Sequence, residues 1–441
     1  MGLRQRASTP TLVDPVTRGW AVVTSAGMVR LGLGFIASLV IARALGPANF
    51  GVYAVLAATV GIVGSLAEGG LTEAAVLRIS AVWPTRSGEA RQRARAFFWL
   101  RVGLAAAIVA AGCVLADQLA QHFLQVDAGL LRWALLGIVA TAASGAVSAM
   151  LQATGAFGRM SSLTLLNTGL TAVLAVALAL VDRLDLVAAL VVLGIGTSLA
   201  TFRVGRSMLP AGWRLALPNA NDLKDLKMEA VLLFCTGRWL WLASLFAMLT
   251  ANAEVLLLNR WAALPLVGAY ALALNLATKA DLVNTSLYTV LLPGVATLDG
   301  RGRVASYMRR GLFRSGMISL GLLALIPIAE PFIVFVYGAE FAQAVLFFRL
   351  LVGVMIFDVL LTPFLLLPLA YRQPRLLAAA DALRAGTLIA VALASIPAYG
   401  AIGAIVARFA ARVAGATLVL CVLYLRKPLE VQHEKAASLV E

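Results

Sequence analysis

Charged residues, and residues suited to metal or nucleophilic chemistry, are scarce in this chain. Only 13% of its 441 residues are charged, whereas 61% are hydrophobic and the mean hydropathy is +0.92; a soluble domain carries about 25% charged residues. Such an apolar chain would aggregate in water, which excludes a soluble enzyme, a disordered chain and a secreted disulfide scaffold. What remains is a polytopic membrane protein built from α-helices.

Cysteine and histidine are too few and too scattered for a site. Cys113, Cys235 and Cys421 each lie in an apolar run, and His122 and His433 lie far apart, in a short loop and in the tail. An odd number of cysteines so placed gives neither a disulfide framework nor metal-ligand spacing. The sequence therefore predicts no metal, no cofactor and no enzymatic activity.

The apolar runs predict twelve membrane spans of about 20 residues or more. The expected spans cover 20–42, 50–77, 97–119, 130–152, 161–181, 186–208, 231–258, 266–293, 312–337, 343–370, 376–397 and 401–425.

The basic residues indicate the orientation. With a cytoplasmic N-terminus, 25 of the 36 lysines and arginines fall in cytoplasmic tails and loops, 5 fall outside and 6 fall within spans. Arg101 is counted here with the cytoplasmic loop before the third span. This asymmetry is the positive-inside pattern, and it predicts that both termini are cytoplasmic. The net charge of +15 then reflects orientation, with contact to anionic lipids, rather than nucleic-acid binding.

The spans divide into two blocks of six. A polar connection of mixed charge follows the sixth span, and an even number of helices gives both halves the same orientation, as in transporters with parallel repeats. The expected division is a cytoplasmic tail at 1–19, an N-lobe at 20–208, a linker at 209–230, a C-lobe at 231–425 and a cytoplasmic tail at 426–441.

Short motifs spread over about 18–426 resemble one family. The segment 43–53 (RALGPANFGVY) resembles the "ARxLGpxxfGxy" segment of polysaccharide, or O-antigen-type, flippases, which belong to the multidrug/oligosaccharidyl-lipid/polysaccharide (MOP) exporter superfamily. The segment 68–78 (EGGLTEAAVLR) is similar to that family's "dxGlxxaxxR", with Glu68 in place of the usual aspartate. Further matches, in the expected order, lie at 256–260 (LLLNR), 268–271 (GAYA), 337–341 (YGAEF) and 399–404 (YGAIGA).

The resemblance implies a fold and a function. It implies an all-α membrane protein with twelve helices in two six-helix lobes around a central cavity. It also implies alternating-access transport of undecaprenyl-pyrophosphate-linked saccharide units to the outer leaflet of the bacterial cytoplasmic membrane, for surface polysaccharide biosynthesis. The expected partners are this lipid-linked saccharide, membrane lipids and polysaccharide polymerase machinery, and we expect a monomer.

Cations inside spans are the candidate contacts for a pyrophosphate, because an unpaired charge is costly in the membrane and a guanidinium binds phosphate through two parallel hydrogen bonds. Arg30 lies roughly 15–18 Å into the first span, and Lys279 lies deep in the eighth. The related flippases for lipid-linked peptidoglycan precursors resemble this pattern. Structural alternatives are an ion pair for Arg30 with a neighbouring helix and, for Lys279, a pair with Asp358.

Three further arginines extend the predicted substrate-binding set. Arg238 occupies the position in the seventh span that corresponds to Arg30, although it lies close enough to the helix end to reach the interface. Arg408 and Arg412 share one face of the twelfth span, where they either contact phosphate or pair with acids. Asp381 and Arg384 are expected to neutralise each other.

Acidic residues within the spans are candidates for ion coupling. Asp281, Asp358, Glu254 and Glu73 could bind a proton or a sodium ion. Glu73 lies toward the inner end of the second span, where a solvated helix end is the alternative. The sequence leaves proton coupling, sodium coupling and no coupling open.

Three other functions remain as alternatives. A peptidoglycan-precursor flippase and a drug/cation antiporter belong to the same superfamily, and the second would favour acids and aromatics in its cavity over cations. A membrane-integral glycan polymerase or ligase would carry a large outer loop, whereas every outer loop expected here is short.

Overall fold

The computed structural model describes residues 15–213, 222–281, 301–367 and 374–425, together with Asn284, Leu287 and Leu291. Helices account for nearly all of this part of the chain, which contains no strand. The first half contains α1 (Pro15–Glu68), α2 (Leu71–Ser80), α3 (Ser87–Val114), α4 (Ala116–Leu119), the π-helical turn η1 (Ala120–Leu124), α5 (Ala128–Ala153), α6 (Phe157–Leu180), α7 (Leu186–Ala188), the π-helical stretch η2 (Ala189–Gly196) and α8 (Thr197–Met208).

The second half continues with longer helices. It contains α9 (Asp222–Trp261), α10 (Leu264–Ala280), α12 (Arg301–Tyr337), the 3₁₀ turn η3 (Ala339–Phe341), α13 (Ala342–Leu365), α15 (Pro374–Tyr399) and α16 (Ala401–Leu425). Helix α9 begins inside the segment 209–230 that the sequence predicts as a linker.

The helices confirm the predicted class of an all-α membrane protein. Ten helical segments of the described chain are long and apolar enough to cross a membrane, against twelve predicted spans. Two features account for the difference: α1 holds the first two predicted spans in one segment, and α10 is apolar but has only 17 described residues.

Helix α1 turns sharply at Gly46–Pro47. Gly46 has φ 68° and ψ 172°, a backbone conformation that only glycine adopts readily, and proline at the next position cannot continue the helical hydrogen bonding. The helix therefore doubles back, and its two arms correspond to the first two predicted spans. We call the end of the molecule that carries this turn the kink end.

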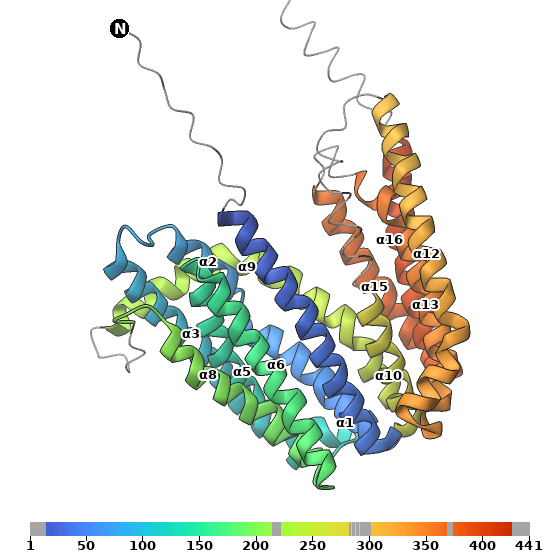
Figure 1. The fold of residues 1–441 in the computed structure, drawn as a ribbon, viewed down its shortest axis with the longest axis horizontal. Helices are drawn as coiled ribbons and strands as arrows, with labels where there is room; N and C mark the ends of the chain where they lie inside the picture. The colour runs from blue at the N-terminus through green and yellow to red at the C-terminus, as the bar shows by residue number, and fades with distance from the viewer. Residues whose placement is uncertain are drawn as a thin grey trace, which may run out of the picture.

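The two halves form two bundles, the N-lobe (α1–α8) and the C-lobe (α10–α16), which converge at the kink end and diverge toward the end where the chain starts (Figure 1). At the convergence α1 packs directly on α10. A Cβ atom added to Gly268 would lie 1.9 Å from the Pro47 carbonyl oxygen, and one added to Gly51 would lie 2.3 Å from that of Leu264. The backbones are therefore in contact, as at the small-residue crossings of membrane helices. We call these four residues the glycine seam.

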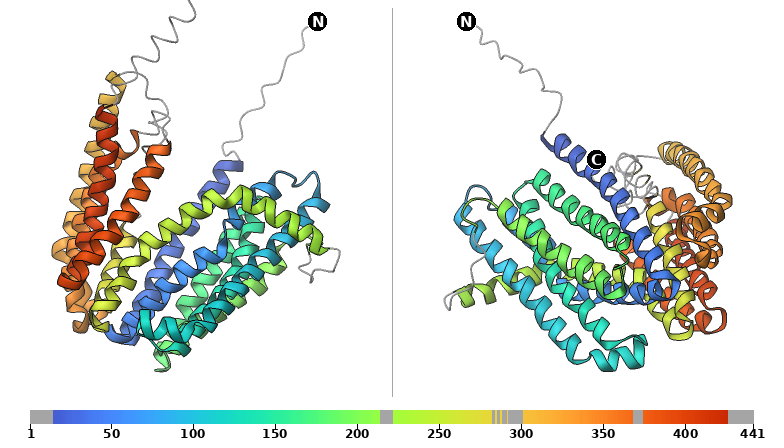
Figure 2. Two further views of the ribbon diagram at one scale, coloured as in Figure 1. Left: turned by 180° about the vertical axis from the view of Figure 1, so that it is seen from behind. Right: turned by 60° about the horizontal axis from the view of Figure 1, so that its bottom comes forward.

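Helix α9 belongs to both bundles. It packs on α1, α2 and α3 of the N-lobe and on α10, α15 and α16 of the C-lobe, and the view from behind shows it crossing from one bundle to the other (Figure 2). Its crossing with the N-lobe is close, since a Cβ atom on Gly237 would lie 2.2 Å from the Gly70 carbonyl oxygen. The indole N–H of Trp241 donates to the Ser65 carbonyl at 3.2 Å.

Candidate functional site

Arg30 lies on the first arm of α1. Figure 1 shows this arm along the side of the N-lobe that faces the C-lobe. Arg30 is exposed, and its side chain has no hydrogen bond or ion pair within the described part of the chain. The alternative interpretation, an ion pair with a neighbouring helix, therefore finds no support among the described residues. Arg30 is a cation available to a ligand.

Lys279 connects the two lobes, about three helical turns along α10 from Gly268 of the glycine seam. From the last turn of α10, its ammonium group donates to Ser38 Oγ on α1 at 3.1 Å and to the amide oxygen of Asn275 on its own helix. It also lies 5.9 Å from the ring centre of Phe35, a favourable cation–π contact. The predicted alternative, an ion pair with Asp358, is wrong, because Asp358 pairs with Arg412. Lys279 is half-buried, and its contacts among the described residues are with neutral groups.

Arg238 lies on the crossing helix α9. It is exposed, and its guanidinium lies 5.7 Å from the ring centre of the neighbouring Trp239. In the described residues no carboxylate pairs with it. The structure thus leaves three predicted cations, Arg30, Lys279 and Arg238, without an acidic partner in the described chain.

Arg408 is committed to an acid inside the C-lobe. Two of its guanidinium nitrogens donate to one carboxylate oxygen of Glu254, at 3.0 and 2.9 Å, and the Tyr270 hydroxyl donates to the same oxygen. Glu254 and Tyr270 are both fully buried. Glu254, Tyr270 and Arg408 come from α9, α10 and α16, so this cluster connects three helices. No local sequence pattern indicates that these helices meet.

Arg412 pairs with Asp358 in the same region. Its Nε lies 3.1 Å from the carboxylate, and the Asp358 side chain is 10% exposed. Of the two possibilities that the sequence left open for these arginines on α16, the structure shows pairing with acids. The predicted Asp381–Arg384 pair is also present, at 3.1 Å.

Two of the four candidate coupling acids, Asp281 and Glu73, have no basic partner among the described residues. Asp281 follows α10 and borders a small cavity of about 40 Å³, together with Asp358, Arg408 and Arg412. Glu73 is exposed near the start of α2. No described group of three or more His, Cys, Asp or Glu side chains is arranged to hold a metal ion. An ion-coupling role for these acids stays a prediction.

An ion pair in the N-lobe, partly buried, was not predicted from the sequence. Arg101, which was counted with a cytoplasmic loop, lies within α3 with its side chain 12% exposed, and its Nη1 is 2.8 Å from Glu68 at the end of α1. It also donates to the Thr72 hydroxyl and, at 3.3 Å, to the Ala142 carbonyl. The sequence did contain a signal for this ion pair, since Glu68 and Arg101 lie toward the facing ends of two consecutive predicted spans.

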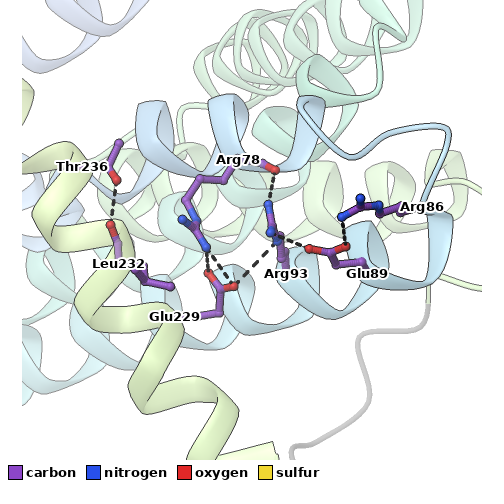
Figure 3. A network of polar contacts seen from close by, with 7 residues as sticks. All are labelled: Arg78, Arg86, Glu89, Arg93, Glu229, Leu232 and Thr236. Carbon is purple, nitrogen blue, oxygen red and sulfur yellow. Dashed lines mark hydrogen bonds and ion pairs between the residues drawn. The ribbon is translucent and has the colours of Figure 1, made fainter.

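A second unpredicted network fixes the start of α9 to the N-lobe (Figure 3). Glu229 on α9 accepts from Arg78 on α2 at 3.2 Å and lies 3.8 Å from Arg93 on α3. Arg93 and Arg86 both pair with Glu89, at 2.5 and 3.5 Å. These arginines thus contribute to the structure as well as to the predicted orientation.

Comparisons with known proteins agree with this architecture. The structure is similar to that of the lipid II flippase MurJ in an inward closed conformation, with a TM-score of 0.67, 12% identity, and 92% of this chain and 87% of that chain covered. It is also similar to an inward-facing multidrug resistance MATE family transporter of the MOP superfamily, with a TM-score of 0.66, 14% identity, and 92% and 97% covered. An outward-facing MATE transporter gives a TM-score of 0.59, 16% identity, and 94% and 98% covered.

The fold is therefore the one found in the lipid II flippase MurJ and in MATE transporters. The model of the "Polysaccharide biosynthesis protein" family matches residues 40–346, and the chain belongs to this family. A sequence search of curated proteins gives no significant match. Family and fold together confirm the predicted resemblance, and the protein is a multi-pass membrane protein.

Proposed function

We propose that this protein moves undecaprenyl-pyrophosphate-linked oligosaccharide units from the inner to the outer leaflet of the bacterial cytoplasmic membrane by alternating access, for surface polysaccharide biosynthesis. The observation that carries the proposal is the pair of cations Arg30 and Lys279. They lie on helices α1 and α10, which meet where the lobes converge, and no described carboxylate neutralises either one.

An anionic lipid head explains why unpaired cations lie at this depth. A charge inside the membrane is costly unless it is paired or hydrated, so it marks a ligand path. Ser38, which holds Lys279, lies about 12 Å along α1 from Arg30. The two cations therefore contact a migrating pyrophosphate at successive levels, first Arg30 and then Lys279.

The other cations take different roles in this proposal. Arg238 is exposed on the helix that crosses between the lobes, and we assign it to early contact with the head group. The ion pairs of Arg408 and Arg412 compete with any phosphate contact. We therefore assign these two arginines to holding the C-lobe together.

The predicted orientation places the kink end on the outer side of the membrane. The lobes are in contact at that end and diverge toward the predicted cytoplasmic side (Figure 1). This arrangement suits loading of a lipid-linked substrate from the inner leaflet. A drug/cation antiporter of the same fold is disfavoured, because the unpaired charges on this path would repel a cationic substrate.

The test is translocation of the lipid-linked saccharide. Arg30→Ala with Lys279→Ala removes two charge-assisted contacts, and we expect a loss of about 100-fold or more. Surface polysaccharide should disappear while lipid-linked saccharide accumulates inside the cell. Arg206→Ala, which removes an exposed cation near the end of α8, is the matched control and should behave as wild type. Normal polysaccharide output from the double variant at normal protein level would refute the assignment.

A further inference from the structure

A cavity of about 280 Å³ with polar and apolar walls lies within the N-lobe, and neither Arg30 nor Lys279 lines it. Its walls come from the second arm of α1, from α3 and α5, and from the crossing helix α9. Small residues of α1, Gly61 and Gly64, leave the space open, and no described atom lies within 4 Å of a Cβ built on Gly64.

Three hydroxyl groups line this cavity, and one of them has no hydrogen-bond partner among the described residues. Ser65 is only 6% exposed, and its Oγ has no hydrogen-bond partner among the described residues. The hydroxyls of Thr141 and Ser244 each donate to a carbonyl of their own helix, at 3.0 and 2.9 Å, so their oxygen lone pairs remain free to accept. A buried polar group is unfavourable without a partner, so Ser65 indicates a missing ligand or water.

The charges at the cavity cancel. Glu68 and Arg101 both line it, and they pair with each other at 2.8 Å. Glu68 would repel a phosphate and Arg101 would repel a cationic drug, so a bare ion of either sign is disfavoured. A neutral ligand with many hydroxyl groups could hydrogen-bond to the hydroxyl oxygens of Thr141 and Ser244. It could also bind the Glu68–Arg101 ion pair and give the Ser65 hydroxyl a partner.

The cavity lies at the level of Arg30. Along the two arms of α1, Ser65 is about 28 Å and Arg30 about 24 Å from Gly46 at the turn. The wall contributed by α9 includes Met248, which is 43% exposed, so the cavity borders the surface on the helix that crosses between the lobes. A group attached to a head held at Arg30 is therefore at the depth of this cavity.

We infer that this N-lobe cavity is a saccharide subsite, which binds a sugar of the lipid-linked substrate while Arg30 and Lys279 contact its pyrophosphate. The inference rests on the proposed function and deepens it. The volume is near the lower end of the ~300–1,000 Å³ of small-molecule sites. It suits one sugar-sized group and not the whole oligosaccharide or its lipid.

The test blocks the cavity without disturbing its ion pair. Gly64→Leu projects a side chain into the open space, and Gly103→Leu is its matched control, since Gly103 on α3 is exposed, lies outside the cavity lining and has no atom within 4 Å of its Cβ. The purified full-length protein is mixed with lipid-linked saccharides extracted from the source cells and with bare undecaprenyl pyrophosphate. Native mass spectrometry then measures the ratio of bound glycosylated lipid to bound bare lipid.

We expect the wild type and Gly103→Leu to prefer the glycosylated lipid. Gly64→Leu should reduce this preference by about tenfold or more and still bind bare undecaprenyl pyrophosphate. An unchanged preference in Gly64→Leu, or none in the wild type, overturns the saccharide subsite. The variant Arg30→Ala with Lys279→Ala should lose both lipids, and its full retention of both would instead contradict the proposed function.

Discussion

At the scale of single residues, the cations within the spans are of two kinds: some pair with carboxylates, and others contact neutral groups. Arg408 and Arg412 face carboxylates, whereas Lys279 is held by a serine, an asparagine and an aromatic ring. A cation held by neutral groups keeps its charge available for an anion. A cation paired with a buried acid stabilises the fold.

The pair of Arg408 with Glu254 gives a prediction about stability. Arg408→Met leaves the fully buried Glu254 without its cation, and removing one partner of a buried pair costs about 3–5 kcal/mol. We expect a clear fall in the melting temperature of the purified protein. Adding Glu254→Gln to Arg408→Met should recover much of that loss, because the unpaired charge is gone.

The matched comparison for this pair is an exposed arginine on a described helix. Arg203→Met removes a cation from the surface of α8 and should change the melting temperature little. Equal stability of Arg408→Met and Arg203→Met would contradict a structural role for the Glu254 pair.

At the scale of elements, the glycine seam gives a second prediction. Gly268→Ala places a methyl group against the Pro47 carbonyl, a contact that can be relieved only by separating α1 from α10. Overpacking of this kind costs about 1–3 kcal/mol. We expect a lower melting temperature and easier cleavage by added protease.

The control for the seam is a glycine with free space. Gly321→Ala lies in α12, where no atom is within 4 Å of the added carbon, and it should be neutral or slightly stabilising. The interpretation of the seam fails if both alanine variants behave alike.

The sequence was sufficient for most of the helices and for the pair of Asp381 with Arg384 within one helix, but it did not identify the partners of ion pairs between helices. Apolar runs predicted the spans, including the break between the first two, because span length is a local property. The sharp turn at Gly46–Pro47 lies in that break and was found in the structure. The partner of Arg101 could not be found in this way. Glu68 lies 33 residues away, on a different arm of the fold, and only the packing of α1 against α3 brings the two together.

At the scale of the whole molecule, the orientation is open to a direct test. A reporter fused after Asp222, at the start of α9, should read as cytoplasmic, and one fused after Asp182, between α6 and α7, should read as external. The basic residues near the start of α3 keep their effect on orientation even where they form ion pairs, because orientation is set by their positive charge while the chain inserts into the membrane. An external signal at Asp222 would reverse the topology and, with it, the direction of transport.

The charge cancellation inside the C-lobe has an electrical consequence. Moving one elementary charge through 100 mV is worth about 2.3 kcal/mol, but Arg408 with Glu254 and Arg412 with Asp358 carry no net charge as they move together. The membrane voltage therefore does almost no work on these pairs when the lobes rearrange. Lys279 has no such counter-charge among the described residues. In the proposed transport cycle, voltage therefore acts on this charge until an anionic head group binds beside it.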